Sequence, residues 1–179
     1  MTLRLRTRTP GETRRAGERI GRALRAGDVV LLSGELGAGK TVLAQGIGRG
    51  MGVPDPIKSS SFVIMNEYDG TSLRLFHADL YRLEAPEQVA ELALDELASG
   101  GVLVVEWPER APGELPPEHL LVRVSYEGAR ERSIELAGHG ERYVELVRGL
   151  AARSGSSMER EGRRRQGTTD ERQQTAEGK

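Results

Sequence analysis

Residues 34–41 read GELGAGKT, and this short segment constrains the fold more than any other part of the chain. It follows the apolar run VVLL and precedes a helical pattern that begins near Lys40. Glycine disfavours helices and strands by up to about 1 kcal/mol per residue relative to alanine, so glycines clustered at such a junction need a reason. The segment matches the phosphate-binding loop Gly-x-x-x-x-Gly-Lys-Thr at each defined position, in the strand–loop–helix order that this motif requires.

The residue types of this loop suit a bound phosphate. Backbone N–H groups must converge on the anion, and a side chain at Gly37 or Gly39 would obstruct them. The N-terminus of the following helix adds its partial positive charge. We expect Lys40 to reach the β- and γ-phosphates and the Thr41 hydroxyl to bind magnesium. The sequence therefore predicts a nucleotide site rather than a bare turn.

A second magnesium contact is expected from an acid at the end of a neighbouring strand. Asp79 follows an apolar strand segment, and Glu106 ends the most apolar one, VLVVE. Either could be an ordinary surface carboxylate, but a buried strand seldom ends in an acid without a partner, which favours a function for Glu106. His77 could be a base, although a hydrogen-bonded structural histidine is the more common interpretation of such a residue.

The composition fits one soluble domain followed by a polar tail. Of 179 residues, 37% are hydrophobic and 30% charged, and the net charge of −1 creates no general attraction to nucleic acid. No apolar run approaches the ~20 residues of a membrane span, and we expect no secretory signal. The lack of cysteine excludes disulfides and is compatible with a cytoplasmic location. We divide the chain into a phosphate-loop ATPase domain, residues 1–152, and a disordered tail, residues 153–179.

Strand and helix patterns alternate along the folded part. The pattern predicts helices over residues 10–26, 40–49, 89–99 and 141–152, the first one capped by Thr9. It predicts strands within residues 28–34, 60–68, 72–83, 102–107, 120–127 and 132–136. Two of these strands are wholly apolar, which indicates burial on both faces. We therefore expect a single-domain α/β fold with a mostly parallel sheet covered by helices on both faces.

The nucleotide is expected to be ATP. Proteins that use this loop for GTP read guanine with an Asn-Lys-x-Asp motif late in the chain. The nearest string here is NEYD at Asn66, which has glutamate in place of lysine and occurs too early. ATP is thus favoured by the absence of a guanine motif.

Three blocks, GELGAGKT, HADLYRL and VVEWPER, occur in this order and resemble the TsaE (YjeE) family of ATPases. The second and third blocks are more specific than the first, and the similarity runs from about Thr7 to Leu150. The resemblance implies an ATPase of the bacterial machinery that makes threonylcarbamoyladenosine in tRNA. Such a protein acts on the TsaB–TsaD complex, meets tRNA only through it, and uses hydrolysis to reset it between turnovers.

The resemblance also implies roles for single residues. Lys40 would hold phosphate, Thr41 and Asp79 would serve magnesium, and Glu106 would act at the γ-phosphate or the metal. We expect Trp107 beside the nucleotide, with Thr9 and Arg132 near it. The predicted nucleotide-binding residues are Thr9, Gly37, Ala38, Gly39, Lys40, Thr41, Val42, Trp107 and Arg132.

One segment departs from the family. The usual Ser-Pro-Thr-Phe or Tyr is Ser59-Ser60-Ser61-Phe62 here, and loss of the proline frees the backbone at Ser60.

Two other functions use the same loop. A small-molecule or nucleoside kinase would need an arginine-bearing lid, whereas the densest arginines, 163–165, lie in the tail. A nucleotide-dependent binding switch would need no hydrolysis at all. Turnover with water, with nucleosides and with the partner proteins separates these alternatives.

Overall fold

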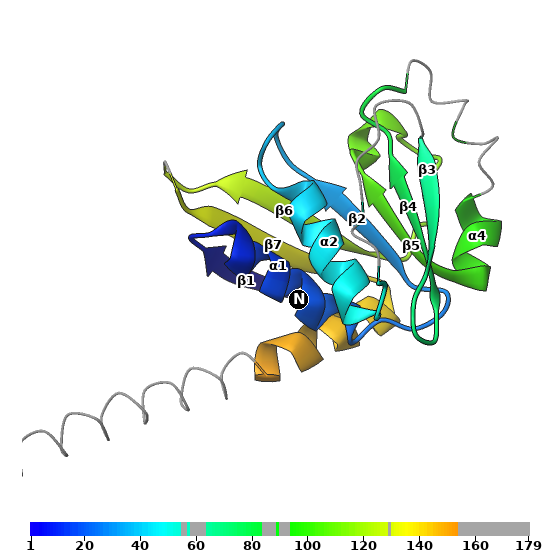
Figure 1. Cartoon of the computed structure of the whole chain (residues 1–179), viewed down its shortest axis with the longest axis horizontal. Helices are drawn as coiled ribbons and strands as arrows, with labels where there is room; N and C mark the ends of the chain where they lie inside the picture. The colour runs from blue at the N-terminus through cyan, green and yellow to red at the C-terminus, as the bar shows by residue number, and fades with distance from the viewer. Residues whose placement is uncertain (55–56, 58–63, 84–88, 90–93, 129, 154–179) are drawn as a thin grey trace, which may run out of the picture.

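Seven strands form one sheet, with helices packed on its two faces (Figure 1). The computed structural model describes residues 1–54, 57, 64–83, 89, 94–128 and 130–153. The strands are β1 (Thr2–Thr7), β2 (Val29–Ser33), β3 (Met65–Asp69), β4 (Arg74–Asp79), β5 (Gly101–Glu106), β6 (His119–Tyr126) and β7 (Arg132–His139). The helices are α1 (Pro10–Gly21), α2 (Lys40–Gly50), α4 (Leu94–Gly100), the 3₁₀ helix η1 (Pro108–Arg110) and a C-terminal helix over residues 141–153.

The sheet is mixed, so the expected mostly parallel sheet is wrong. In the strand order β1-β7-β6-β2-β5-β4-β3, the four central strands β6, β2, β5 and β4 run parallel. The pairs β1/β7, β6/β7 and β3/β4 are antiparallel. β3 and β4 follow each other in the chain, as do β6 and β7, and consecutive strands that pair as a hairpin are antiparallel. The parallel centre nevertheless brings the carboxyl ends of its strands to one edge.

Strand β1 was absent from the sequence prediction. Its Leu3 and Leu5 alternate with Arg4 and Arg6, and the strand pairs with β7 from Thr2 opposite Ala137 to Thr7 opposite Arg132. Helix α1 begins as predicted, because the Thr9 hydroxyl accepts a hydrogen bond from the Glu12 N–H at 3.2 Å. It ends at Gly21, before the predicted stop.

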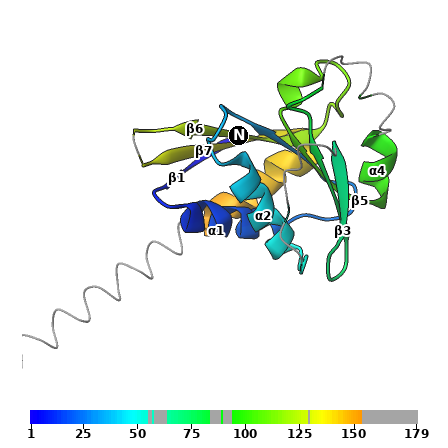
Figure 2. The same cartoon turned by 45° about the horizontal axis from the view of Figure 1, so that its top comes forward.

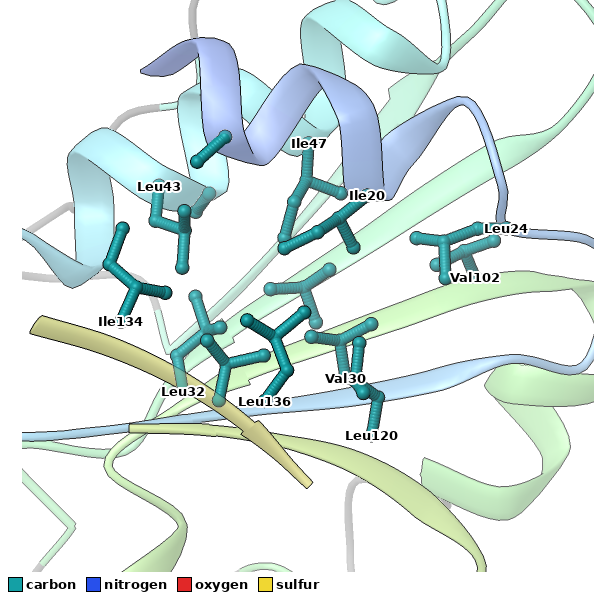
Figure 3. Close-up of a cluster of buried hydrophobic side chains, with 14 of the residues drawn as sticks. Ile20, Leu24, Val30, Leu32, Leu43, Ile47, Val102, Leu120, Ile134 and Leu136 are labelled. Atoms are coloured by element: carbon teal, nitrogen blue, oxygen red, sulfur yellow. The ribbon is translucent and has the colours of Figure 1, made fainter. Parts of the chain in front are cut away.

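Alternation along the central strands divides the core into two layers, as predicted for a sheet covered on both faces. Val30 and Leu32 join the larger apolar cluster, which lies beneath α1 and α2 in Figure 3. Residues of the C-terminal helix belong to the same cluster. Val29 and Leu31 point the other way, toward α4. Figure 2 shows α4 on the side of the sheet opposite α1 and α2. Within the described residues, no helix is long and apolar enough to cross a membrane.

Helices α1 and α2 touch through bare backbone. A Cβ atom on Gly17 of α1 would overlap the carbonyl oxygen of Leu43, and one on Gly46 of α2 would overlap that of Arg14. Gly21 and Gly50, one turn further along each helix, make the same kind of contact. The glycines that weaken α2 in propensity terms therefore allow a close approach that larger residues would prevent.

Replacing Gly46 with alanine is expected to lower the free energy of unfolding by about 1 kcal/mol or more, because overpacking outweighs the gain in helix propensity. Gly149, in the C-terminal helix, has open space where its Cβ would lie, so Gly149→Ala is the matched control. That control is expected to stabilise the protein slightly. Denaturant titration of both variants measures the difference, and a stabilised Gly46→Ala variant would contradict the close contact.

A histidine pair on the β6–β7 hairpin is expected to make stability depend on pH. Burial lowers the pKa of His119 below its ordinary value of 6.5; the hydrogen bond with the Pro116 carbonyl opposes this, and His139, stacked at 4.6 Å, adds to it. The unfolded chain then binds the proton more readily. The contribution of neutral His119 is complete above pH 6.5 and is lost as the pH falls below it. Thermal melts between about pH 7.5 and 5.5 should show a smaller loss for His119→Gln than for the wild type.

Candidate functional site

The glycine-rich loop lies at the carboxyl edge of the parallel strands. It leaves β2 at Ser33 and enters α2 at Lys40. Register pairing places Leu32 of β2 opposite Glu106 of β5, and Asp79 of β4 opposite the same Glu106. The loop and the two acids singled out in the sequence therefore meet at one place, which is where open α/β sheets bind ligands.

Three loop glycines adopt backbone angles that side chains disfavour. Gly34, Gly37 and Gly39 have φ values of 145°, 76° and 112°. A Cβ on Gly34 would also overlap the carbonyl oxygen of Val124 in β6. All three positions need glycine for their backbone angles, and Gly34 needs it for close approach as well.

The β6–β7 hairpin holds the loop from outside. The Tyr126 hydroxyl donates to the Leu36 carbonyl at 3.3 Å, and Arg132 Nε donates to the Ala38 carbonyl at 3.1 Å. In a trans peptide the N–H points opposite to the C=O, so the N–H groups of Gly37 and Gly39 point away from these two side chains. The loop thus presents N–H groups on its inner side.

Those N–H groups have no acceptor within the part of the chain that the structure describes. This holds for Gly37 and Gly39 in the loop, and for Lys40 and Thr41 at the start of α2. Unpaired donors at a helix N-terminus, added to the helix dipole, favour an anion there.

Lys40 is held against the loop. Its side chain is largely buried, at 4% exposure, and Nζ donates to the carbonyls of Gly34 and Glu35 at 2.6 and 2.9 Å. Burial lowers the pKa of the Lys40 ammonium, and the nearby carboxylates of Glu106, Glu109 and Asp79 oppose that shift. Nζ also lies 3.6 Å from the ring centroid of Trp107. A phosphate entering the loop would replace part of these contacts with a stronger, charge-assisted one.

Thr41, Glu106 and His77 form a hydrogen-bonded chain. The Thr41 hydroxyl donates to Glu106 Oε2 at 3.0 Å, and His77 Nε2 lies 2.9 Å from Glu106 Oε1. Glu106 is only 2% exposed. The acid at the end of the most apolar strand is therefore buried with partners, as the sequence argument required. Asp79 lies beside it, with Oδ1 accepting from the Tyr81 N–H at 3.1 Å.

A cavity of about 280 Å³ opens between the loop and these acids. Trp107 lines it in a left-handed backbone conformation, with φ 62°, the one positive φ among described residues other than glycine. The backbone N–H of Trp107 donates to the Leu32 carbonyl at 3.1 Å, and the centroid of its ring lies 4.8 Å from that of the Tyr81 ring. Strain of this kind persists where surrounding contacts impose it, commonly at functional sites. The lining residues are Leu36, Gly37, Gly39, Lys40, Thr41, Val42, Asp79, Tyr81, Glu106 and Trp107.

A second, smaller cavity of about 120 Å³ lies on the other side of the loop. Thr9 and Arg132 both line it, together with Ala38 and Val42. The two residues expected near the nucleotide from far-apart segments thus meet beside the loop. Their contacts there are the helix cap of Thr9 and the Arg132 bond to Ala38.

The structure brings every predicted site residue to one of the two cavities. Sequence reasoning missed Tyr126 and Tyr81. Tyr81 belongs to the quoted block HADLYRL and could have been noticed there, whereas Tyr126 carries no motif. Arg153, the first residue of the predicted tail 153–179, is still helical. The rest of that tail, residues 154–179, and the departure at residues 59–62 lie outside the described residues.

The fold and the site together define a class: a single α/β domain in which a glycine-rich loop, a helix N-terminus and two strand-end acids share one cavity. A family model described as "Threonylcarbamoyl adenosine biosynthesis protein TsaE" matches residues 7–134. The chain belongs to the TsaE family of tRNA threonylcarbamoyladenosine biosynthesis, as the three sequence blocks indicated.

Individual relatives agree with the family match. The tRNA threonylcarbamoyladenosine biosynthesis protein TsaE of Bacillus subtilis is 37% identical over 150 residues, which cover 83% of this chain and 94% of that relative. The protein of the same name from Nostoc sp. is 43% identical over 122 residues, or 64% of this chain and 74% of the relative. The crystal structure of B. subtilis YdiB superposes with a TM-score of 0.72 at 36% identity, over 86% of this chain and 97% of that one.

Proposed function

We propose that this chain is the ATP-binding and ATP-hydrolysing subunit of the tRNA threonylcarbamoyladenosine machinery. The observation that carries the proposal is the Thr41–Glu106 hydrogen bond at the start of α2, beside a glycine loop whose N–H groups lack acceptors among the described residues. A charged phosphate would satisfy those donors, and Lys40 lies within the same cavity.

The residues present fit a magnesium ion that arrives with the nucleotide. Magnesium prefers oxygen ligands and usually takes one or two carboxylates, with phosphate and water completing its shell. The Thr41 hydroxyl donates a hydrogen bond to Glu106, so the lone pairs of the Thr41 oxygen remain available for a cation. Asp79 adds a second carboxylate to the same cavity. No group of three or more His, Asp or Glu side chains able to hold a metal occurs among the described residues.

Glu106 is proposed to position or activate the attacking water. Its carboxylate lies at the end of β5, lines the same cavity as the loop, and is buried while accepting a hydrogen bond from Thr41. Magnesium, when bound, would neutralise charge on the phosphates. The chain's own contributions are the donors of the loop, the ammonium of Lys40 and the carboxylate of Glu106.

The nucleoside part is assigned to the smaller cavity. Thr9, Val42 and Arg132 line it on the outer side of the loop, so a nucleotide could span both cavities with its phosphates against the loop. The residues that line this cavity do not include a guanine-reading Asn-Lys-x-Asp motif, and ATP remains the proposed nucleotide.

The proposed partners are TsaB and TsaD, with tRNA met through their complex in the cytoplasm. Leu36 and Tyr81, exposed by 69% and 39%, stand at the rim of the larger cavity. These two side chains would offer apolar contact area to a protein that docks over the site. A partner that docks there would sense the nucleotide directly.

The test measures phosphate release from ATP and magnesium by the chain alone, with TsaB and TsaD, and with nucleosides in their place. Turnover that rises with TsaB and TsaD supports the proposal. Transfer of phosphate to a nucleoside would indicate a kinase, and nucleotide-dependent capture of TsaB–TsaD without turnover would indicate a passive switch. Asp79→Ala should weaken ATP binding mainly when magnesium is present, which tests the metal assignment separately.

A further inference from the structure

His77 and Glu106 form a buried pair that joins β4 to β5. The two side chains are 1% and 2% exposed, and His77 Nε2 lies 2.9 Å from Glu106 Oε1. His77 and Asp79 lie two residues apart on β4 and so share one face of the sheet, with Asp79 directly opposite Glu106. His77 therefore lies two residues further from the carboxyl edge of the sheet than the two acids, behind the cavity rather than in its lining.

Glu106 is held at both carboxylate oxygens. Oε1 is hydrogen-bonded to His77, and Oε2 accepts a hydrogen bond from the Thr41 hydroxyl. The terminal torsion of glutamate is broad, so a carboxylate without such restraint samples many orientations. With Oε1 bonded to His77, the plane of the carboxylate is set and Oε2 faces the Thr41 hydroxyl.

The hydrogen-bond pattern also assigns the imidazole tautomer. Since Glu106 oxygens accept, Nε2 carries the proton and donates it to Oε1. Nδ1 is buried and has no hydrogen-bond partner among the described residues. Because Nδ1 has no acceptor within the described part of the chain, the ring proton is placed on Nε2, where Glu106 accepts it.

We propose that His77 is a positioning residue, which fixes the Glu106 carboxylate so that Oε2 stays directed at Thr41 and the reacting phosphate. This inference rests on the proposed ATPase function of the same site. His77 does not line the cavity and touches no reacting atom; it acts through Glu106. Misplacing a catalytic group by about 1 Å can cost roughly 10²-fold in rate, so an unrestrained Glu106 should be a poor catalyst.

A structural role for His77 makes different predictions. A histidine that only fills the core would lower the melting temperature when replaced, and the folded protein would retain its turnover number. A positioning role changes the turnover number of folded protein, depends on a donor at the Nε2 position, and disappears when Glu106 is already disabled.

The experiment compares His77→Leu, which removes the donor, with His77→Gln, whose amide can reach Oε1. Turnover with TsaB and TsaD, ATP affinity in EDTA, and melting temperature are measured for each. We expect His77→Leu to lose about 30-fold or more in turnover while its affinity in EDTA stays within about twofold. His77→Gln should recover most of the rate. Phe76→Leu, the neighbouring buried residue on the opposite face of β4, is the control that lowers stability without lowering turnover.

A double variant completes the design. If His77 acts through Glu106, His77→Leu added to Glu106→Gln should cost no further turnover, to within about twofold. Multiplied losses in the double variant, an unchanged rate in folded His77→Leu, or a His77→Gln variant as slow as His77→Leu would each overturn the proposal. Should His77→Leu not fold, His77→Asn, whose amide is too short to reach Oε1, takes its place. A wild-type chain without turnover would overturn the proposed function itself, which is a separate result.

Discussion

Replacing Glu106 with glutamine is expected to give a protein that binds ATP but hydrolyses it at least roughly 100-fold more slowly. Glutamine keeps the shape of the side chain and can still bond His77 and Thr41, so the fold and the cavity should persist. What disappears is the negative charge that would position or activate water. Nucleotide affinity, measured by calorimetry with and without magnesium, should change far less than the turnover number.

Glu109→Gln is the matched control for this variant. Glu109 lies on η1, close enough to contribute to the field at Lys40, but it is exposed and has no bond to Thr41. Removing its charge tests whether a general loss of negative charge near the cavity slows hydrolysis. Wild-type turnover in Glu106→Gln would show that Glu106 is structural, and would remove the catalytic assignment.

The second large effect is expected at Lys40. Lys40→Ala should weaken ATP binding by ~2 kcal/mol or more, equivalent to roughly 30-fold, because a charge-assisted bond to phosphate is lost. The fold should survive, since among the described residues the hydrogen bonds of Nζ go to the loop carbonyls of Gly34 and Glu35, and its further contact is with the Trp107 ring, all within the site. Calorimetric titration of the folded variant measures the loss.

Arg49→Ala provides the control for net charge. Arg49 lies on the last turn of the same helix, is 62% exposed at its side chain and contacts Glu18 at 3.9 Å. It removes the same unit of charge at the far end of α2, and its effect on ATP affinity should be small. Equal affinities for Lys40→Ala and the wild type would contradict the assignment of the loop as a phosphate site.

The sequence predicted the loop and its neighbours well because their signals are local. The GELGAGKT spacing, the apolar run of β2 and the cap at Thr9 each depend on residues within a few positions of one another. β1 escaped notice because its two leucines give a weak pattern and its stability comes from pairing with β7, over 120 residues later. The antiparallel pairs of the sheet were not predicted for the same reason, since strand direction follows from tertiary pairing.

Within the site, what could not be foreseen was how the residues are joined. His77 and Glu106 stand 29 positions apart, and only the parallel register of β4 and β5 brings them together. The contact of Tyr126 with Leu36 spans 90 positions and follows from the hairpin register that sets Tyr126 opposite Arg132. Neither spacing forms a motif, so the sequence identifies candidate functional residues more readily than the residues that hold them in place.

The backbone contact between α1 and α2 bears on what the smaller cavity can accept. One wall of that cavity is formed by the start of α1, with Thr9, Pro10 and Thr13. The other is formed by the loop and by Val42 at the start of α2. Because backbone meets backbone at Gly17 and Gly46, the spacing between α1 and α2 is set by the main chain rather than by side-chain packing. The distance between the α1 wall and the α2 wall of the smaller cavity therefore depends on main-chain contact. Enlarging Gly17 or Gly46 would push these two walls apart, whereas mutating Arg8, Arg130 or Arg132, whose side chains also line the cavity, would reshape it without changing that spacing.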